Sequence, residues 1–282
     1  MSIIKLKSAV RIAHTLGNWL GSLLYVLPNP IQRTVLKNLT IAYADMPAAQ
    51  RQQLLKQNLQ QVCQSLLESF VLWKAPQAQA IALVQDCQNW HLVEQALQQQ
   101  RGIIFLTPHL GCFEITSMYY AAHHPITVLF RQPKLAWLRK IIMQGRQQPG
   151  VKLAPANQRG VRLLLQALQR GEAIGILPDQ TPSKAEGEWA AFYGKPAYTM
   201  TLVSKLALKS QAQVIMAFGE RLPNSQGYVI HLKALTTQQV STPALLNQAV
   251  QAQIEVCPSQ YFWAYDRYKA SRKALKKLSV KG

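Results

Sequence analysis

The chain has 282 residues, of which 49% are apolar, so it can bury a large hydrophobic core and an intrinsically disordered protein is disfavoured. Its 31 Lys and Arg residues outnumber its 12 Asp and Glu residues, and the formal charge of +19 predicts an anionic partner. The four cysteines show no C-x-x-C spacing and the chain carries no metal-binding or cofactor-binding motif, so we expect no disulfide framework, no metal and no cofactor.

The basic residues are unevenly distributed. No acidic residue precedes Asp45, none lies between Glu114 and Glu172, and seven basic residues occupy 267–281. Nucleic acid and anionic lipid head groups both suit such a charge pattern. Because the basic residues form no zinc-finger, helix-turn-helix or RNA-recognition pattern, and no aromatic residues are interleaved with them, we predict membrane lipids and no nucleic acid as partners.

The first predicted element is an amphipathic helix at residues 8–27. Arg11, His14 and Asn18 share one of its faces. Apolar side chains fill the opposite face: Ile12, Leu16, Trp19, Leu20 and Leu23. A spanning helix needs about 20 mainly apolar residues, so the segment either crosses a membrane or lies in its interface, unless it is an ordinary helix packed on the protein. We therefore divide the chain into a membrane-associated helix, residues 1–30, and an α/β domain, residues 31–282.

Two more helices are predicted at residues 31–43 and 48–72, separated by Met46-Pro47. From Gly102 onward, short apolar runs alternate with helical periodicity. The predicted strands are 103–106, 126–130, 151–153, 173–177, 214–218 and 228–235, with helices at 161–168 and 245–256. This alternation indicates an α/β fold with a mainly parallel or mixed central sheet flanked by helices.

The strongest chemical signal is the segment TPHLGCFE at 107–114, directly after the first predicted strand. Ligands collect at the carboxyl ends of strands in open α/β sheets. His109 and Glu114 would be about 140° apart on a continuous helix, so they can meet only if His109 lies in a strand-to-helix turn, which Pro108 and Gly111 favour.

An imidazole with an ordinary pKa of about 6.5 accepts a proton near neutral pH, and a neighbouring carboxylate fixes its tautomer. We therefore predict that His109 and Glu114 activate a hydroxyl group. The alternative is a capping His and a first-turn Glu that is favoured by the helix dipole.

Further polar clusters also follow predicted strands. Arg131 comes after the strand at 126–130 and Asp179 after the strand at 173–177, and a third cluster, FYGK at 192–195, precedes a helix. These positions allow the clusters to converge on one cleft.

This layout resembles the late acyltransferases of lipid A biosynthesis, the lauroyl/myristoyl transferase family related to the glycerol-phosphate acyltransferases. The resemblance covers most of the chain. It includes the N-terminal apolar helix, Asn38-Leu39, the His-x4-Glu block, the strand followed by Arg131, Pro178-Asp179-Gln180, the block at 192–194, YFW at 261–263 and RYK at 267–269. It implies an enzyme that transfers an acyl chain from an acyl carrier protein thioester to a hydroxyl of a phosphorylated glucosamine lipid, a lipid A precursor, at the cytoplasmic face of the inner membrane.

The resemblance also implies residue roles. His109 is expected to be the general base and Glu114 its orienting partner. Arg131 is expected to hold a phosphate or the developing oxyanion, because a guanidinium makes bidentate contacts. Asp179 would orient Arg131 or a basic residue on the acceptor side. The alternatives are a surface arginine at a strand end and a turn-forming aspartate after Pro178.

The resemblance further implies that Gly194 and Lys195 suit close backbone approach and phosphate contact, although Gly-Lys before Pro196 is also an ordinary turn. Two other functions stay open. The first is acyl transfer to a lysophospholipid or another glycolipid, and the second is a non-catalytic, basic membrane-surface binding protein. A hydrolase is disfavoured because the chain has neither a G-x-S-x-G elbow nor an H-E-x-x-H helix.

Overall fold

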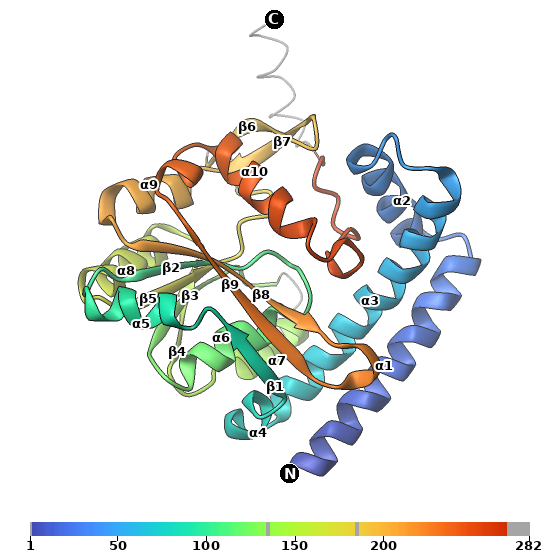
Figure 1. Ribbon diagram of the computed structural model, residues 1–282, viewed down its shortest axis with the longest axis horizontal. Coiled ribbons are helices and arrows are strands. Elements are labelled where there is room, and N and C mark those ends of the chain that lie inside the picture. Colours follow the sequence, from blue (N-terminus) through green and yellow to red (C-terminus); the bar gives the residue numbers. More distant parts are fainter. Residues whose placement is uncertain (1, 134–135, 184–185, 270–282) are drawn as a thin grey trace, which may run out of the picture.

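The computed structural model describes residues 2–133, 136–183 and 186–269, so most of the basic segment 267–281 lies outside the described residues. Its centre is a seven-stranded sheet in the order β1-β9-β8-β2-β5-β3-β4, and helices cover both faces of it (Figure 1). β8 and β9 are antiparallel, whereas the other neighbouring strands of this sheet are parallel. The predicted α/β class with a mainly parallel sheet is confirmed.

All six predicted strands are present. The strands of the sheet are β1 (Val84–Gln88), β2 (Ile103–Leu106), β3 (Ile126–Phe130), β4 (Val151–Pro155), β5 (Ala173–Ile176), β8 (Gln213–Arg221) and β9 (Tyr228–Leu235). The prediction that the sheet begins near Gly102 is wrong, because β1 pairs with β9 at the sheet edge. β1 has the sequence VQDCQ and is only partly buried, so it lacks the apolar run by which the other strands were predicted.

A separate antiparallel hairpin was also not predicted. It consists of β6 (Gly187–Phe192) and β7 (Lys195–Met200), and its turn contains Tyr193 and Gly194, which both have positive φ. The remaining helices are α5 (His91–Gln98), α6 (Phe113–Ala121), α7 (Ala136–Arg146), α8 (Gln158–Gln169), α9 (Leu202–Ser210) and α10 (Pro243–Ile254), with 3-10 turns η1 (Pro223–Ser225), η2 (Gln238–Val240) and η3 (Pro258–Gln260). The helices predicted at 161–168 and 245–256 are α8 and α10.

The two faces of the sheet carry separate hydrophobic clusters. Ile104 and Leu106 of β2 belong to one cluster, and Ile103 and Phe105 belong to the other. This is the alternation that a strand imposes on successive side chains. Because both faces are buried, the central strands are continuous apolar runs, which is why they could be located in the sequence.

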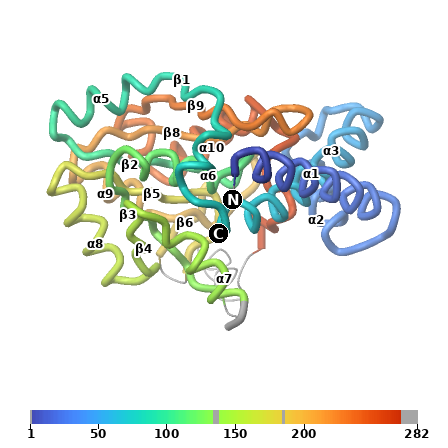
Figure 2. Tube along the Cα trace, turned by 90° about the horizontal axis from the view of Figure 1, so that it is seen from below, coloured from blue at the N-terminus to red at the C-terminus, as the bar shows by residue number. Residues whose placement is uncertain are grey.

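The N-terminal helices form a layer beside the sheet (Figure 2). They are α1 (Ile3–Val26), α2 (Pro30–Ala42), α3 (Ala48–Lys74) and the short α4 (Gln77–Ile81). Side chains of Ser2 and Asn29 cap α1 and α2, and Pro30 opens α2. α1 and α3 pack closely because α1 has glycines at the contact: a Cβ added to Gly21 would lie 2.3 Å from the Cα of Gln60. The helices predicted at 31–43 and 48–72 are confirmed.

The inner face of α1 is buried and contains both apolar side chains, Leu6 and Val10, and the polar side chain of His14. His14 is buried, with its two ring nitrogens 2.7 Å from Glu68 Oε2 and 2.9 Å from Ser225 Oγ. Ile12 and Trp19, in contrast, are 60% and 64% exposed. The described helices include none with the length and apolar character that crossing a membrane requires. From Ile12 to Val26, α1 exposes a stripe of large apolar side chains.

Candidate active site

The loop 107–112 connects β2 to α6 and carries His109. Gly111 has φ +61°, and a Cβ at this position would lie 2.1 Å from the carbonyl oxygen of Gly219, so only glycine fits. Three backbone hydrogen bonds fix the loop: Gly111 N donates to Gln260 O at 3.0 Å, Cys112 N to Gly219 O at 2.7 Å, and Phe262 N to His109 O at 2.9 Å. The close approach of β8 and the segment 258–262 thus determines where His109 lies.

Asp179 holds the imidazole of His109. Asp179 follows β5, the neighbour of β2, and its carboxylate accepts the backbone N–H of His109 at 2.9 Å while its other oxygen lies 2.9 Å from His109 Nδ1. Burial alone would raise the pKa of Asp179, but the charge and hydrogen bonds of His109 hold that pKa below its ordinary value. An ionised Asp179 accepts a hydrogen bond from Nδ1–H, which keeps the proton on Nδ1 and leaves Nε2 as the nitrogen that can act as a base.

The other surroundings of the imidazole are also defined. The side-chain amide nitrogen of Gln180 lies 3.1 Å from His109 Nε2. The ring centroids of Phe113 and Phe262 lie 4.9 Å and 6.3 Å from that of the imidazole. The His109 side chain is 15% exposed, so part of the imidazole is open to solvent.

Among the described residues Glu114 forms no hydrogen bond with His109, so the structure does not bring together the pair expected from the sequence. α6 begins at Phe113, and this start directs the Glu114 side chain toward α7, where it accepts hydrogen bonds from Arg146 Nε at 2.9 Å and 3.1 Å. The carboxylate that fixes His109 comes from Asp179, a residue expected to orient Arg131 or a basic acceptor-side residue. Asp179 has no hydrogen bond to Arg131 within the part of the chain that the structure describes.

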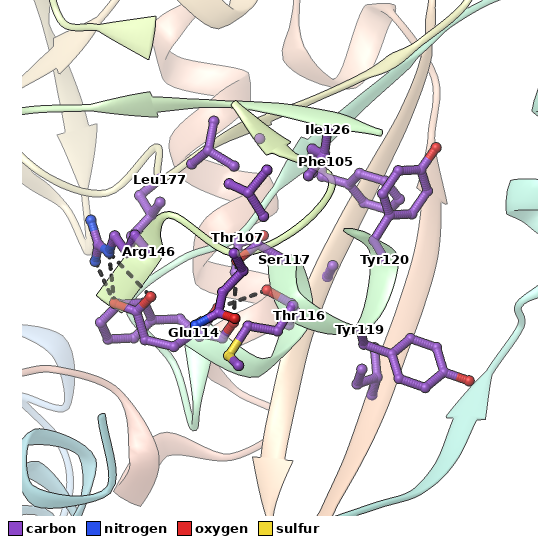
Figure 3. Close-up of a pocket in the computed structure, with 18 of the residues that line it drawn as sticks. Phe105, Thr107, Glu114, Thr116, Ser117, Tyr119, Tyr120, Ile126, Arg146 and Leu177 are labelled. Atoms are coloured by element: carbon purple, nitrogen blue, oxygen red, sulfur yellow. Dashed lines mark hydrogen bonds and ion pairs between the residues drawn. The ribbon is translucent and has the colours of Figure 1, made fainter. Parts of the chain in front are cut away.

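An apolar pocket lies beside Glu114 and Arg146. Figure 3 shows Glu114 and Arg146 at one end and Tyr119 and Tyr120 toward the other. The walls between them include Phe105, Thr107, Thr116, Ser117, Ile126, Val128, Gly175 and Leu177. The free space in the pocket is about 50 Å³.

Arg131 follows β3, the neighbour of β5 in the sheet, and contacts the segment after β5. It is exposed, and its guanidinium donates to Ser183 Oγ at 2.9 Å and to the carbonyl of Thr181 at 3.4 Å. Thr181 N in turn donates to the hydroxyl of Tyr265 at 3.0 Å. The segments after β3 and β5 therefore meet, as predicted, and the C-terminal segment joins them.

Gly194 and Lys195 lie at the tip of the β6–β7 hairpin. Gly194 has φ +70°, and a Cβ there would meet nothing within 4 Å, so the backbone conformation and not a close approach accounts for the glycine. Lys195 is exposed. No hydrogen bond among the described residues connects this tip to His109 or Asp179. Their expected role in binding phosphate remains a prediction.

Sequence reasoning missed two residues at the site. Arg146 was assigned no role at the site from the sequence, but it binds the buried carboxylate of Glu114, and its guanidinium carbon lies 5.4 Å from the centroid of the Phe130 ring. Gln180 was noted only as part of a motif. The scarcity of acidic residues around Glu114 was the available signal for Arg146, since a lone buried carboxylate in a basic stretch requires a cation.

Comparison with known proteins gives consistent matches. A sequence model of the family described as bacterial lipid A biosynthesis acyltransferase matches residues 4–270. A lipid A biosynthesis acyltransferase of Haemophilus influenzae is 26% identical over 243 residues, which cover 83% of this chain and 76% of that protein. The lipid A biosynthesis lauroyltransferase of Escherichia coli is 23% identical over 267 residues, which cover 92% of this chain and 85% of that protein. The lipid A biosynthesis palmitoleoyltransferase of Escherichia coli is 22% identical over 245 residues, covering 83% and 77%.

Proposed function

Because the chain belongs to the bacterial lipid A biosynthesis acyltransferase family, we propose that it transfers a fatty acyl group from an acyl carrier protein thioester to a hydroxyl group of a phosphorylated lipid A precursor. The observation that carries the proposal is the contact of 2.9 Å between His109 Nδ1 and the buried carboxylate of Asp179. It lies at the carboxyl end of the parallel strands β2 and β5, where α/β enzymes bind their ligands.

His109 acts as the general base in this proposal. Asp179 keeps the proton on Nδ1, so Nε2 accepts the proton of the acceptor hydroxyl as its oxygen attacks the thioester carbon. The carbon–sulfur bond then breaks, and the imidazolium returns the proton to the thiolate. This direct transfer needs no covalent enzyme intermediate, which agrees with the absence of a nucleophile hydrogen-bonded to His109 within the described residues.

Two arginines supply positive charge in this reaction. Arg146, held in place by Glu114, presents a guanidinium at the end of the apolar pocket, and Arg131 lies on the exposed side. We assign to them the stabilisation of the developing oxyanion and the binding of a phosphate, because guanidinium groups suit both tasks. Lys195 and the backbone at Gly194 are proposed to contact acceptor phosphate.

The apolar pocket suits the acyl chain of the donor. Its walls are mainly aromatic and aliphatic side chains, and it starts at Glu114, five residues after the proposed base. A free space of about 50 Å³ holds roughly two groups of water size, so it accommodates the part of the chain next to the thioester, and longer chains require the walls to separate.

The proposed location is the cytoplasmic face of the inner membrane, with α1 lying in the interface. Large apolar side chains of α1 are exposed on one side: Ile4, Ile12, Leu16, Trp19, Leu23 and Val26. A soluble protein seldom exposes so continuous an apolar stripe, whereas an interfacial helix buries such a face in lipid. The net charge of +19 favours anionic lipid surfaces and the acidic carrier protein.

The deciding experiment compares His109→Ala with His91→Ala, since His91 is exposed on α5 away from the site. Each purified protein is given lauroyl-acyl carrier protein with a lipid A precursor or with a lysophospholipid, and products are identified by mass spectrometry. We expect acylated lipid A precursor from the wild-type protein and His91→Ala, and none from His109→Ala. A preference for the lysophospholipid would assign a different acceptor, and full activity of a folded His109→Ala protein would overturn the mechanism.

A further inference from the structure

The side-chain amide of Gln180 lies within hydrogen-bond distance of His109 Nε2, the nitrogen that accepts a proton in the proposed reaction. Its amide nitrogen lies 3.1 Å from His109 Nε2, on the opposite side of the ring from Asp179. Gln180 follows Asp179 directly, so the element that fixes one ring nitrogen also carries the group that covers the other. Both side chains therefore act on one imidazole.

The hydrogen-bond chemistry determines which group donates. Asp179 accepts a hydrogen bond from Nδ1–H, so a neutral imidazole presents a lone pair at Nε2, and an amide NH₂ is the matching donor. A base whose lone pair already accepts a hydrogen bond has no orbital free for a substrate proton. Any hydroxyl that His109 activates must first displace the Gln180 amide.

We propose that Gln180 is a positioning residue that caps the reactive nitrogen of His109 in the free enzyme and yields it to the acceptor hydroxyl. The inference rests on the proposed function, in which His109 is the base. Water displaces the Gln180 amide from Nε2 poorly, because one water molecule makes no other contacts with the protein. A lipid acceptor makes many contacts, and these offset the loss of the Gln180 hydrogen bond. The cap thus reserves the base for the acceptor and protects the bound thioester from hydrolysis.

The reaction that the cap suppresses is hydrolysis of the thioester, in which the proton follows the same path as in acyl transfer. Water would lose a proton to His109 Nε2 and attack the thioester carbon, and the thiolate would leave and recover the proton. The products are a free fatty acid and the free thiol of the carrier protein. The ratio of hydrolysis to transfer therefore measures how well the cap works.

The test uses Gln180→Leu, which is similar in size and cannot donate a hydrogen bond, with Gln226→Leu on an exposed turn as the matched control. The full chain is given lauroyl-acyl carrier protein with and without a lipid A precursor, and thiol release and lipid acylation are measured. A lost hydrogen bond of ordinary strength corresponds to about a tenfold change, so we expect the hydrolysis-to-transfer ratio to rise roughly tenfold in Gln180→Leu and to stay at the wild-type value in Gln226→Leu.

Two further variants separate the cap from other roles. In His109→Ala/Gln180→Leu the extra hydrolysis should disappear, because it needs the base. In Gln180→Glu a carboxylate beside Nε2 favours the protonated imidazole, so the acid limb of the activity-versus-pH curve should move to higher pH. An unchanged or lower ratio in folded Gln180→Leu overturns the cap. Transfer that persists in His109→Ala instead overturns the proposed function, so the two failures are distinguishable.

Discussion

Glu68 of α3 and Arg221 at the end of β8 form a buried ion pair that joins the N-terminal helices to the sheet. Arg221 Nε donates to Glu68 Oε2 at 2.9 Å, and Tyr228 Oη donates to the same oxygen at 2.9 Å. His14 of α1 approaches it at 2.7 Å. The backbone N–H and carbonyl of Arg221 both bond the side chain of Gln260, whose own carbonyl accepts the N–H of Gly111. The pair therefore stabilises the loop that carries His109.

The ion pair predicts how stability depends on pH. Burial would raise the pKa of Glu68, but Arg221 and His14 lower it from 4.5 to about 2. A carboxyl group whose pKa is lower when folded stabilises the protein above the unfolded value, and the contribution is lost as pH falls toward the folded value. We expect the free energy of unfolding to decrease by on the order of 3 kcal/mol between pH 4.5 and 2. Denaturant unfolding of Glu68→Gln should lack this decrease, while Glu188→Gln, at an exposed position, should retain it.

Asp179→Asn should remove most of the activity without unfolding the protein. An asparagine can accept the backbone N–H of His109, but its amide presents a donor or a neutral acceptor to Nδ1, so the tautomer with a free Nε2 loses its support. In a related arrangement of His and Asp, this change lowers kcat about 10⁴-fold. We expect a loss of 10³-fold or more in kcat, with little change in the apparent KM for the donor. A loss below tenfold would show that Asp179 does not set the tautomer.

The exposed face of α1 should determine membrane binding. Ile12→Glu and Trp19→Glu place a charge where the interface is expected, and each should shift protein from liposomes to the soluble fraction in flotation assays. Leu208→Glu, at another exposed apolar residue on α9, is the control and should leave binding unchanged. Equal release by all three variants would mean that general charge, and not α1, governs binding.

Deletion of α1 is a poor test of whether its exposed face binds membranes. The division of the chain at residue 30 would suggest that residues 1–27 can be removed without unfolding the α/β domain, but Leu6 and Val10 of α1 are 0% and 2% exposed and pack in the core. Their loss would expose Leu72 and neighbouring groups. Point substitutions on the outer face avoid this difficulty.

Two glycines with similar backbone conformations should tolerate alanine very differently. Gly111 has φ +61° and a Cβ there would lie 2.1 Å from the Gly219 carbonyl, whereas Gly194 has φ +70° and open space. Gly194→Ala should cost about 1 kcal/mol, the cost of a left-handed conformation. Gly111→Ala should cost several times more, because the loop and β8 must separate. Calorimetry of both variants checks the difference, and equal melting temperatures would contradict the proposed constraint on the loop.

The sequence predicted elements well where both faces of a strand are buried, and poorly where contacts come from distant segments. β2 and β3 were located at their observed bounds because β2 is wholly apolar and β3 is apolar except for Thr127. β1 was missed because an edge strand such as VQDCQ has no such run. The position of His109 was foreseen, but its partner was not, since Asp179 is 70 residues away and reaches it only through the pairing of β2 with β5. Spacing along the chain favoured Glu114, and the start of α6 at Phe113 turned Glu114 toward α7.

Arg146 and Lys140 provide a matched comparison on α7. Arg146 binds Glu114 beside the pocket, whereas Lys140 is exposed. Arg146→Met should lower kcat, and higher donor concentration or lower salt should not restore it, because the lost charge acts at the reacting carbonyl. Lys140→Met should instead raise the apparent KM for acyl carrier protein and leave kcat unchanged, since an exposed charge mainly affects encounter with an acidic partner.

A structural explanation for Arg146 can be separated from a chemical one. Arg146→Met leaves the carboxylate of Glu114 buried without its partner, which would itself destabilise the site by several kcal/mol. Arg146→Met/Glu114→Gln removes that unpaired charge, so its melting temperature should recover toward the wild-type value. If Arg146 stabilises charge in the transition state, transfer by the double variant stays low although the fold is restored. Recovery of kcat together with stability would instead show that the ion pair serves only to support α6 and α7.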